Sequence, residues 1–257
     1  VMAAFLLWGI RDLPRAFAVP EWKSAAVAGF FLLISFIFCF SPVHQYDSLV
    51  YHMALPQLYV LRHAVGAVPE NMYSHFPQNA EMLFTLALLF KSNALAQLMT
   101  WTAFSLTALW VYVLARRISP RAAILSLLFV LSQTALWLLS STTYVENFVA
   151  LWLTAAFCCF LQWSQTAEGR RKWALLAGVF CGAALGTKYY AGIGFAGIFA
   201  LMVYCALSAG WFSEKKQRVL DCFIFAAAVF ALYLPWGVKN IAETGNPVFP
   251  FLYRVFG

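Results

Sequence analysis

The sequence predicts an all-α membrane protein, a polytopic bundle of transmembrane helices. Of its 257 residues, 63% are hydrophobic and only 11% are charged, which leaves too little polar surface to cover a soluble domain of this size. The hydrophobic residues form long runs separated by short charged clusters, the pattern of helices that cross a membrane. A membrane β-barrel would instead alternate hydrophobic and polar residues over about ten positions, and the chain lacks that alternation.

The hydrophobic runs predict about seven full spans and one partial span within a single domain. Their approximate ranges are 1–10 (partial), 24–43, 94–115, 122–141, 144–164, 172–188, 190–210 and 219–237. Ten residues of helix measure about 15 Å, half of what a bilayer requires. Because no repeat or linker divides the sequence, we expect one transmembrane domain over 1–257, truncated at both ends.

Four basic clusters predict how the bundle is oriented. They are Arg11, Arg15 and Lys23; Arg116, Arg117 and Arg121; Arg170, Arg171 and Lys172; and Lys215, Lys216 and Arg218. An even number of crossings separates each cluster from the next, so the positive-inside rule assigns all four to the cytoplasm. With the acids beside them they account for the whole net charge of +7. The charge therefore reports topology, and no nucleic-acid partner is expected.

The longest connection, residues 44–79, is predicted to be an extracytoplasmic loop that holds most of the polar chemistry. It contains all four histidines of the chain, His44, His52, His63 and His75. Loops of this length in a compact fold are usually functional or disordered. The many tyrosines in this one argue against disorder.

Two stretches on this side are predicted to be helices that do not cross the membrane. Residues 46–63 have helical spacing, with an apolar stripe through Leu49, Met53 and Leu61, which suits a helix lying in the membrane interface. Pro56 would kink that helix or begin its second half. Residues 80–90 are apolar but too short to span, and would be re-entrant, in-plane or the outer part of a broken helix.

Asp47 is the strongest candidate for a catalytic residue. It follows the outer end of the 24–43 span, where a partly desolvated carboxylate beside the apolar phase suits a general base acting on an acceptor hydroxyl. The alternative is an N-cap for the in-plane helix, because aspartate is a preferred cap. Position alone favours neither reading.

Further charged residues are expected on the same side. Glu146 begins the 144–164 span, either as a functional carboxylate at membrane depth or as an acid stabilised by the helix dipole. Lys188, Lys239 and Arg254 would hold a lipid phosphate or only snorkel to the headgroups. For each cation taken singly, snorkelling is the favoured reading.

The sequence offers little support for cofactors. Asp47, His52 and His75 would converge on a divalent cation only through folding, because their spacing matches no known zinc motif. No glycine-rich nucleotide loop is present. All six cysteines lie in or beside apolar runs, where we expect them to act as small buried residues. Any energy-rich donor would therefore approach from the membrane or the outer face.

At several of these positions the chain resembles the C-type glycosyltransferase superfamily, which includes protein O-mannosyltransferases and lipid A aminoarabinose transferases. The resemblance runs over nearly the whole chain. It is carried by Tyr46-Asp47-Ser48-Leu49-Val50-Tyr51-His52, the stretch from Tyr73 to Leu83, Gly186-Thr187-Lys188-Tyr189, and the stretch from Gly245 to Phe251. A single Asp47 stands where the mannosyltransferases commonly have two adjacent acids, which leaves the acceptor class open.

The resemblance implies transfer of a sugar from a polyprenyl-phosphate donor to a glycan, lipid or protein acceptor, with inversion, at the outer face of a bacterial inner membrane. Asp47 would be the general base, and Glu146 a second acid that places donor or acceptor. Lys188, and less surely Lys239 or Arg254, would offset charge on the departing phosphate. The remaining substrate-binding candidates are Tyr46, Tyr51, His52, His75 and Glu81.

Two other functions stay open from the sequence. A transporter or lipid flippase would need ionisable residues near the bilayer midplane and inverted repeats. Asp221 is the only acid well inside a later span, and no repeat is seen. A non-catalytic scaffold would use the loop to bind a partner, which its density of Tyr, His and Asp makes less attractive.

Overall fold

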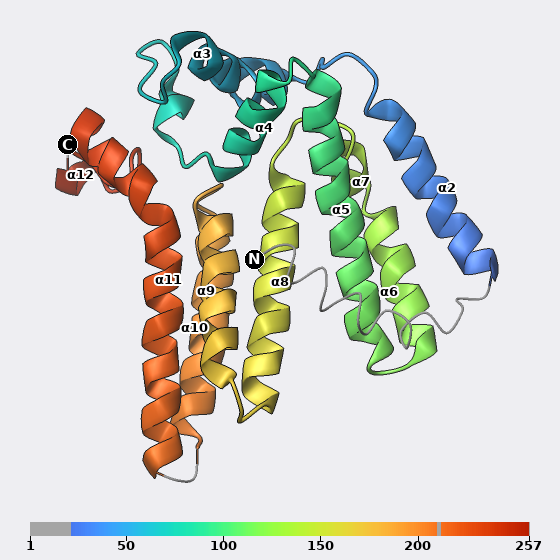
Figure 1. The fold of residues 1–257 in the computed structure, drawn as a ribbon, viewed down its shortest axis with the longest axis vertical. Helices are drawn as coiled ribbons and strands as arrows, with labels where there is room; N and C mark the ends of the chain where they lie inside the picture. The colour runs from blue at the N-terminus through green and yellow to red at the C-terminus, as the bar shows by residue number, and fades with distance from the viewer. Residues whose placement is uncertain (1–21, 210–211, 257) are drawn as a thin grey trace.

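The structure is a computed structural model that describes residues 22–209 and 212–256, and this part of the chain is helical without any strand (Figure 1). Its helices are α2 (Trp22–Phe38), η1 (Ser48–His52), α3 (Ala54–Arg62), η2 (Met72–His75), α4 (Asn79–Leu89), α5 (Asn93–Arg116), α6 (Pro120–Ser132), α7 (Thr134–Leu139), α8 (Glu146–Gln165), α9 (Arg170–Leu185), α10 (Ala191–Leu207), α11 (Phe212–Thr244) and α12 (Tyr253–Phe256). The predicted partial span 1–10 and the basic residues Arg11 and Arg15 lie outside the described residues. The all-α prediction is confirmed.

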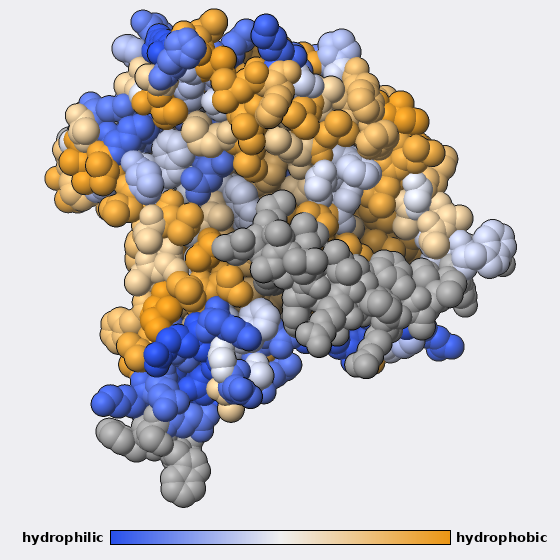
Figure 2. Space-filling view, viewed as in Figure 1, coloured by the Kyte–Doolittle hydropathy of each residue, from blue (hydrophilic) through white to orange (hydrophobic). Residues whose placement is uncertain are grey.

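The long helices run alongside one another, and the short helices α3 and α4 lie across one end of them (Figure 1). Three of the described helices are long and apolar enough to cross a membrane: α5, α8 and the part of α11 from Glu214 to Thr244. Four others are apolar but shorter, at Ser24–Phe38, Asn79–Leu89, Pro120–Ser132 and Ala191–Leu207. Figure 2 shows apolar side chains over the middle of the visible face and hydrophilic ones towards its two ends. The chain is an integral membrane protein.

Helix α9 packs between α8 and α11 and forms the centre of the bundle. A Cβ atom on Gly178 would lie 2.4 Å from the Phe225 carbonyl oxygen, and one on Gly182 would lie 2.7 Å from that of Val229. Both distances are shorter than any real contact. The two glycines therefore let the backbones of α9 and α11 approach closely, as small residues do between membrane helices.

A buried charged cluster joins the same three helices near the basic end of the bundle. Asp221 Oδ2 accepts hydrogen bonds from Arg170 Nε and from Trp163 Nε1, both at 3.0 Å. All three side chains are buried, so the carboxylate is neutralised and hydrogen-bonded, as a buried charge must be. Asp221 is therefore paired within the bundle and joins its three central helices in this structure.

The helix boundaries differ from the predicted spans at three places. α2 ends at Phe38 and not near residue 43, because Pro42 has no amide hydrogen to donate to the Phe38 carbonyl and its ring clashes with that carbonyl in a helix. The predicted span 122–141 is broken into α6 and α7 at Gln133, whose backbone is extended. The last span is longer than predicted: α11 continues through Pro235 to Thr244, so residues 238–244 are helix and not tail.

Candidate active site

Residues 48–62 fold into two consecutive short helices against α4. η1 is a π-helix, in which the Met53 amide donates to the Ser48 carbonyl at 2.8 Å, and α3 follows with Pro56 in its first turn. Tyr51, Leu55 and Tyr59 form the buried side. Leu49 and Leu61 of the predicted apolar stripe are 55% and 70% exposed. Met53 of the same stripe is buried in the core, so only the two ends of the stripe point outward, where they are available to the membrane interface.

Asp47 is half-buried and is held by two tyrosines. Its Oδ2 accepts a hydrogen bond from the Tyr51 hydroxyl at 3.1 Å, and its backbone amide donates to the Tyr144 hydroxyl at 3.3 Å. Asp47 occupies the N-cap position of η1, but its side chain makes no capping hydrogen bond. The carboxylate is thus oriented by Tyr51, while Tyr144 holds the backbone of the same residue. Because the side chain does not cap η1, the capping interpretation is wrong.

Tyr51 lies among three carboxylates. Burial is the main reason why the pKa of Tyr51 lies well above its ordinary value, followed by the charges of Asp47, Glu146 and Glu81. The phenol therefore keeps its proton and can continue to donate to Asp47. Its ring stacks on that of Tyr73, with the centroids 4.2 Å apart. The three acids that the sequence singled out are brought into one neighbourhood.

Glu146 and Lys188 form an ion pair beside this group. Glu146 begins α8, and Lys188 lies in the turn between α9 and α10. Lys188 Nζ donates to Glu146 Oε1, and both side chains are about three-quarters buried. The other carboxylate oxygen, Oε2, is buried and makes no protein hydrogen bond. The pair holds a cation at the start of α8, and the charge of Glu146 reaches Tyr51, the residue that donates to Asp47.

His52 and Glu81 form a second pair that is fully enclosed. His52 Nδ1 lies 2.8 Å from Glu81 Oε1, with side-chain exposures of 0% and 4%. The His52 ring lies 5.5 Å from that of Tyr144, centroid to centroid, so this pair supports the same segment that contacts Asp47. Neither residue is open to a ligand in this structure, which indicates a supporting position behind the site.

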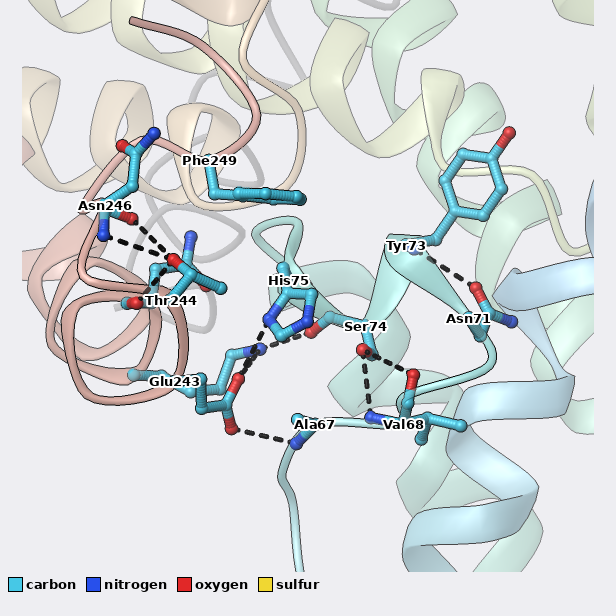
Figure 3. A network of polar contacts seen from close by, with 12 residues as sticks. Ala67, Val68, Asn71, Tyr73, Ser74, His75, Glu243, Thr244, Asn246 and Phe249 are labelled. Carbon is cyan, nitrogen blue, oxygen red and sulfur yellow. Dashed lines mark hydrogen bonds and ion pairs between the residues drawn. The ribbon is translucent and has the colours of Figure 1, made fainter. Parts of the chain in front are cut away.

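His75 and Lys239 belong to a separate polar cluster, shown in Figure 3. Glu243 of α11 accepts from the Ala67 amide at 2.8 Å and from His75 Nδ1 at 3.1 Å. Lys239 Nζ donates to the Ser74 carbonyl and lies 3.5 Å from the Glu243 carboxylate. These contacts fasten residues 67–75 to the end of α11. His75 therefore contacts the end of α11, and no described hydrogen bond or ion pair joins it to Asp47 or His52.

Asn79, the first residue of α4, joins the loop to two helices of the bundle. Its backbone amide donates to the Gly186 carbonyl at 2.8 Å, and its side-chain oxygen accepts from Trp236 Nε1 at 2.8 Å. A Cβ atom on Gly186 would lie 2.1 Å from Asn79 Nδ2. Glycine at this position is therefore required for the side chain of Asn79 to fit.

Two predicted site residues make no described hydrogen bond or ion pair. Tyr46 directly precedes Asp47 but is 75% exposed, and Arg254 is exposed on α12. Sequence reasoning missed Tyr144 and Glu243. The available signal for Glu243 was its spacing of four residues from Lys239.

Within the described part of the chain, no three His, Cys, Asp or Glu side chains gather as metal ligands would.

Comparison with known proteins gives one family and one informative relative. The family model described as dolichyl-phosphate-mannose-protein mannosyltransferase matches residues 70–244, more than half of the chain. An undecaprenyl phosphate-alpha-4-amino-4-deoxy-L-arabinose arabinosyl transferase from Edwardsiella ictaluri is 31% identical over 145 residues, covering 54% of this chain and 25% of that protein. The match thus covers a quarter of the relative's length. No solved structure matches the chain.

Proposed function

Because the chain belongs to the dolichyl-phosphate-mannose-protein mannosyltransferase family, we propose that it is a membrane glycosyltransferase that uses a polyprenyl-phosphate sugar as donor. The acceptor hydroxyl attacks the anomeric carbon from the face opposite the phosphate, so the configuration inverts. The bond from that carbon to the phosphate oxygen breaks, and the lipid phosphate leaves with the electron pair. The reaction takes place on the extracytoplasmic side, where the predicted topology puts residues 44–79.

Asp47 is the general base of this proposal. It receives the proton of the acceptor hydroxyl as the new bond forms, a role that requires a fixed carboxylate with a free oxygen. The supporting observation is the hydrogen bond from Tyr51 to Oδ2, which orients the carboxylate, while no capping bond occupies it. Asp47 precedes the residues matched by the family model, so its role rests on its surroundings.

Lys188 is assigned to the leaving group. A cation close to the departing phosphate lowers the energy of the transition state, in which negative charge builds up on the phosphate oxygen. Its ion pair with Glu146 holds it there before the donor arrives. When the phosphate binds, the ammonium group of Lys188 donates hydrogen bonds to both the phosphate and the Glu146 carboxylate. Glu146 thereby keeps the ammonium group in position.

The test is sugar transfer by the purified full-length protein, with polyprenyl-phosphate mannose and polyprenyl-phosphate aminoarabinose offered as separate donors. We expect Asp47→Asn to reduce kcat by about 10²- to 10⁴-fold, the contribution of a positioned general base. Glu70→Gln is the matched control, since it removes the same charge from an exposed position of the same loop and leaves transfer intact. Near wild-type turnover by Asp47→Asn would contradict the assignment.

A further inference from the structure

An apolar groove lies between α5 and α8, away from the candidate active site. Its volume is about 690 Å³, which is within the usual range for a small-molecule site. The residues that line it are Val111, Leu114, Ala115, Arg117, Ile118, Leu153, Thr154, Phe157, Leu161 and Gln165. They come from the C-terminal end of α5 and from the middle to the end of α8, whereas Glu146 begins α8 at its other end. The groove is therefore separate from the proposed transferase site.

Each helix contributes one stripe of side chains to the groove. On α8 the lining positions 154, 157, 161 and 165 are three or four residues apart. On α5 the lining positions 111, 114 and 115 repeat in the same way, and position 118 follows in the turn after it. This spacing puts each set on a single helix face. Since both helices are candidate membrane spans, the groove runs along the membrane and its apolar walls suit a hydrocarbon chain.

A fixed guanidinium stands at one end of the groove. Arg117 follows the last residue of α5. With the Gln162 amide turned so that its oxygen faces Arg117, that oxygen accepts from the two terminal nitrogens of the guanidinium at 2.8 and 3.3 Å. The arginine thus reaches from α5 to α8. No acidic residue is among the described lining residues, so the positive charge at this end is not offset within the groove.

We propose that this groove binds one anionic glycerophospholipid of the cytoplasmic leaflet. The lipid phosphate lies at Arg117, which provides several hydrogen-bond donors for it, and one acyl chain lies along Leu114, Phe157 and Leu161. Basic pockets between membrane helices on the cytoplasmic side recognise anionic headgroups in this way. The choice of leaflet rests on the predicted orientation of the arginine clusters and not on the transferase activity.

The experiment measures which lipids stay bound to the full chain. The protein is purified from nanodiscs that contain equal amounts of phosphatidylglycerol and phosphatidylcholine, and retained lipids are identified by native mass spectrometry. We expect Arg117→Gln to lower the preference for phosphatidylglycerol on the order of fivefold, the effect of one basic residue at a membrane surface. The matched control is Lys216→Gln, which removes a charge from the same end of the bundle at an exposed position on α11 and keeps the preference.

A second variant tests the acyl-chain part of the groove without changing charge. Ala115→Phe fills the groove between α5 and α8, and we expect it to reduce retention of both lipids while the melting temperature is maintained. If Arg117→Gln and Lys216→Gln lower the preference for phosphatidylglycerol equally, the preference comes from surface charge in general, and the proposed site is overturned. Unchanged retention in Ala115→Phe, or exchange of the bound lipid for added polyprenyl phosphate, would also overturn it.

Discussion

At the scale of single residues, the pair of His52 and Glu81 ties η1 to α4. Both side chains are enclosed, and the Glu81 carboxylate is the only described hydrogen-bond partner of the imidazole. A buried polar group that loses its partner costs free energy, because water no longer compensates for it. The pair therefore stabilises the π-helical turn that follows Asp47.

We expect Glu81→Leu to destabilise the protein by about 1–3 kcal/mol, because it leaves both nitrogens of His52 without a partner. Glu81→Gln keeps an oxygen that can accept from Nδ1, so it should cost less. The melting temperature in detergent, followed by circular dichroism, measures both variants. Equal melting temperatures for the Leu and Gln variants would contradict the importance of this hydrogen bond.

Single residues also mark the limit of prediction from the sequence. Asp47, Glu146 and Lys188 were recognisable because charged residues at the ends of apolar runs are uncommon and costly. Which polar side chains pair with one another was not recognisable, because the partners are far apart in the sequence. His52 and Glu81 are 29 positions apart, and His75 and Glu243 are 168 apart. Such contacts arise from the packing of distant segments, and no local pattern encodes them. In the structure His52 pairs with Glu81 and His75 with Glu243, and within the described residues Asp47, His52 and His75 do not gather as metal ligands would.

At the level of elements, the close approach of α9 and α11 depends on glycine. An alanine at position 178 would place its methyl group against the Phe225 carbonyl, and overpacking of this kind costs about 1–3 kcal/mol. Gly197→Ala is the matched control, since nothing lies within 4 Å of its added Cβ on α10. Alanine there should be neutral or stabilising by up to about 1 kcal/mol.

Thermal unfolding of the two alanine variants measures this difference. Gly178→Ala should melt below the unmodified protein and Gly197→Ala at or above it. If both variants melt alike, the helices are able to move apart at no cost and the close contact is unimportant.

The helices themselves were the best-predicted elements, because hydrocarbon thickness imposes a length on each span. The ranges 94–115 and 144–164 agree closely with α5 and α8. The break at Gln133 was missed because no proline or glycine marks it. The extension of α11 to Thr244 was missed because four of the residues 238–244 are polar or charged, which ends the apolar run. Their helix is held by contacts to the loop, such as that of Lys239 with Ser74.

At the scale of the whole molecule, the family match confirms the resemblance to C-type glycosyltransferases. The described basic clusters lie at the ends of α5, α9 and α11, and the loop with Asp47 lies at the other end. The orientation of this bundle in the membrane is the premise of both proposals. It stays a prediction that rests on the positive-inside rule.

Cysteine labelling tests that orientation. We expect Tyr46→Cys, at an exposed loop position, to react with a membrane-impermeant maleimide added to intact spheroplasts. Lys216→Cys, exposed on α11, should react only after the membrane is opened. Among the native cysteines, five are buried and Cys205 is partly so, which keeps the background low. If Lys216→Cys reacts in intact spheroplasts and Tyr46→Cys reacts only after the membrane is opened, the predicted orientation is inverted and both proposals are contradicted.

The contact between Asn79 and Gly186 has a consequence for how the protein tolerates change. Gly186→Ala alone forces a methyl group onto the Asn79 amide, whereas in Asn79→Ala that amide is already gone. The harm of the first substitution should therefore shrink when the second is present, so the effects of the pair do not add. Melting temperatures of the two single variants and the double variant would reveal this epistasis, and a sequence that drifts at position 186 is expected to have drifted first at position 79.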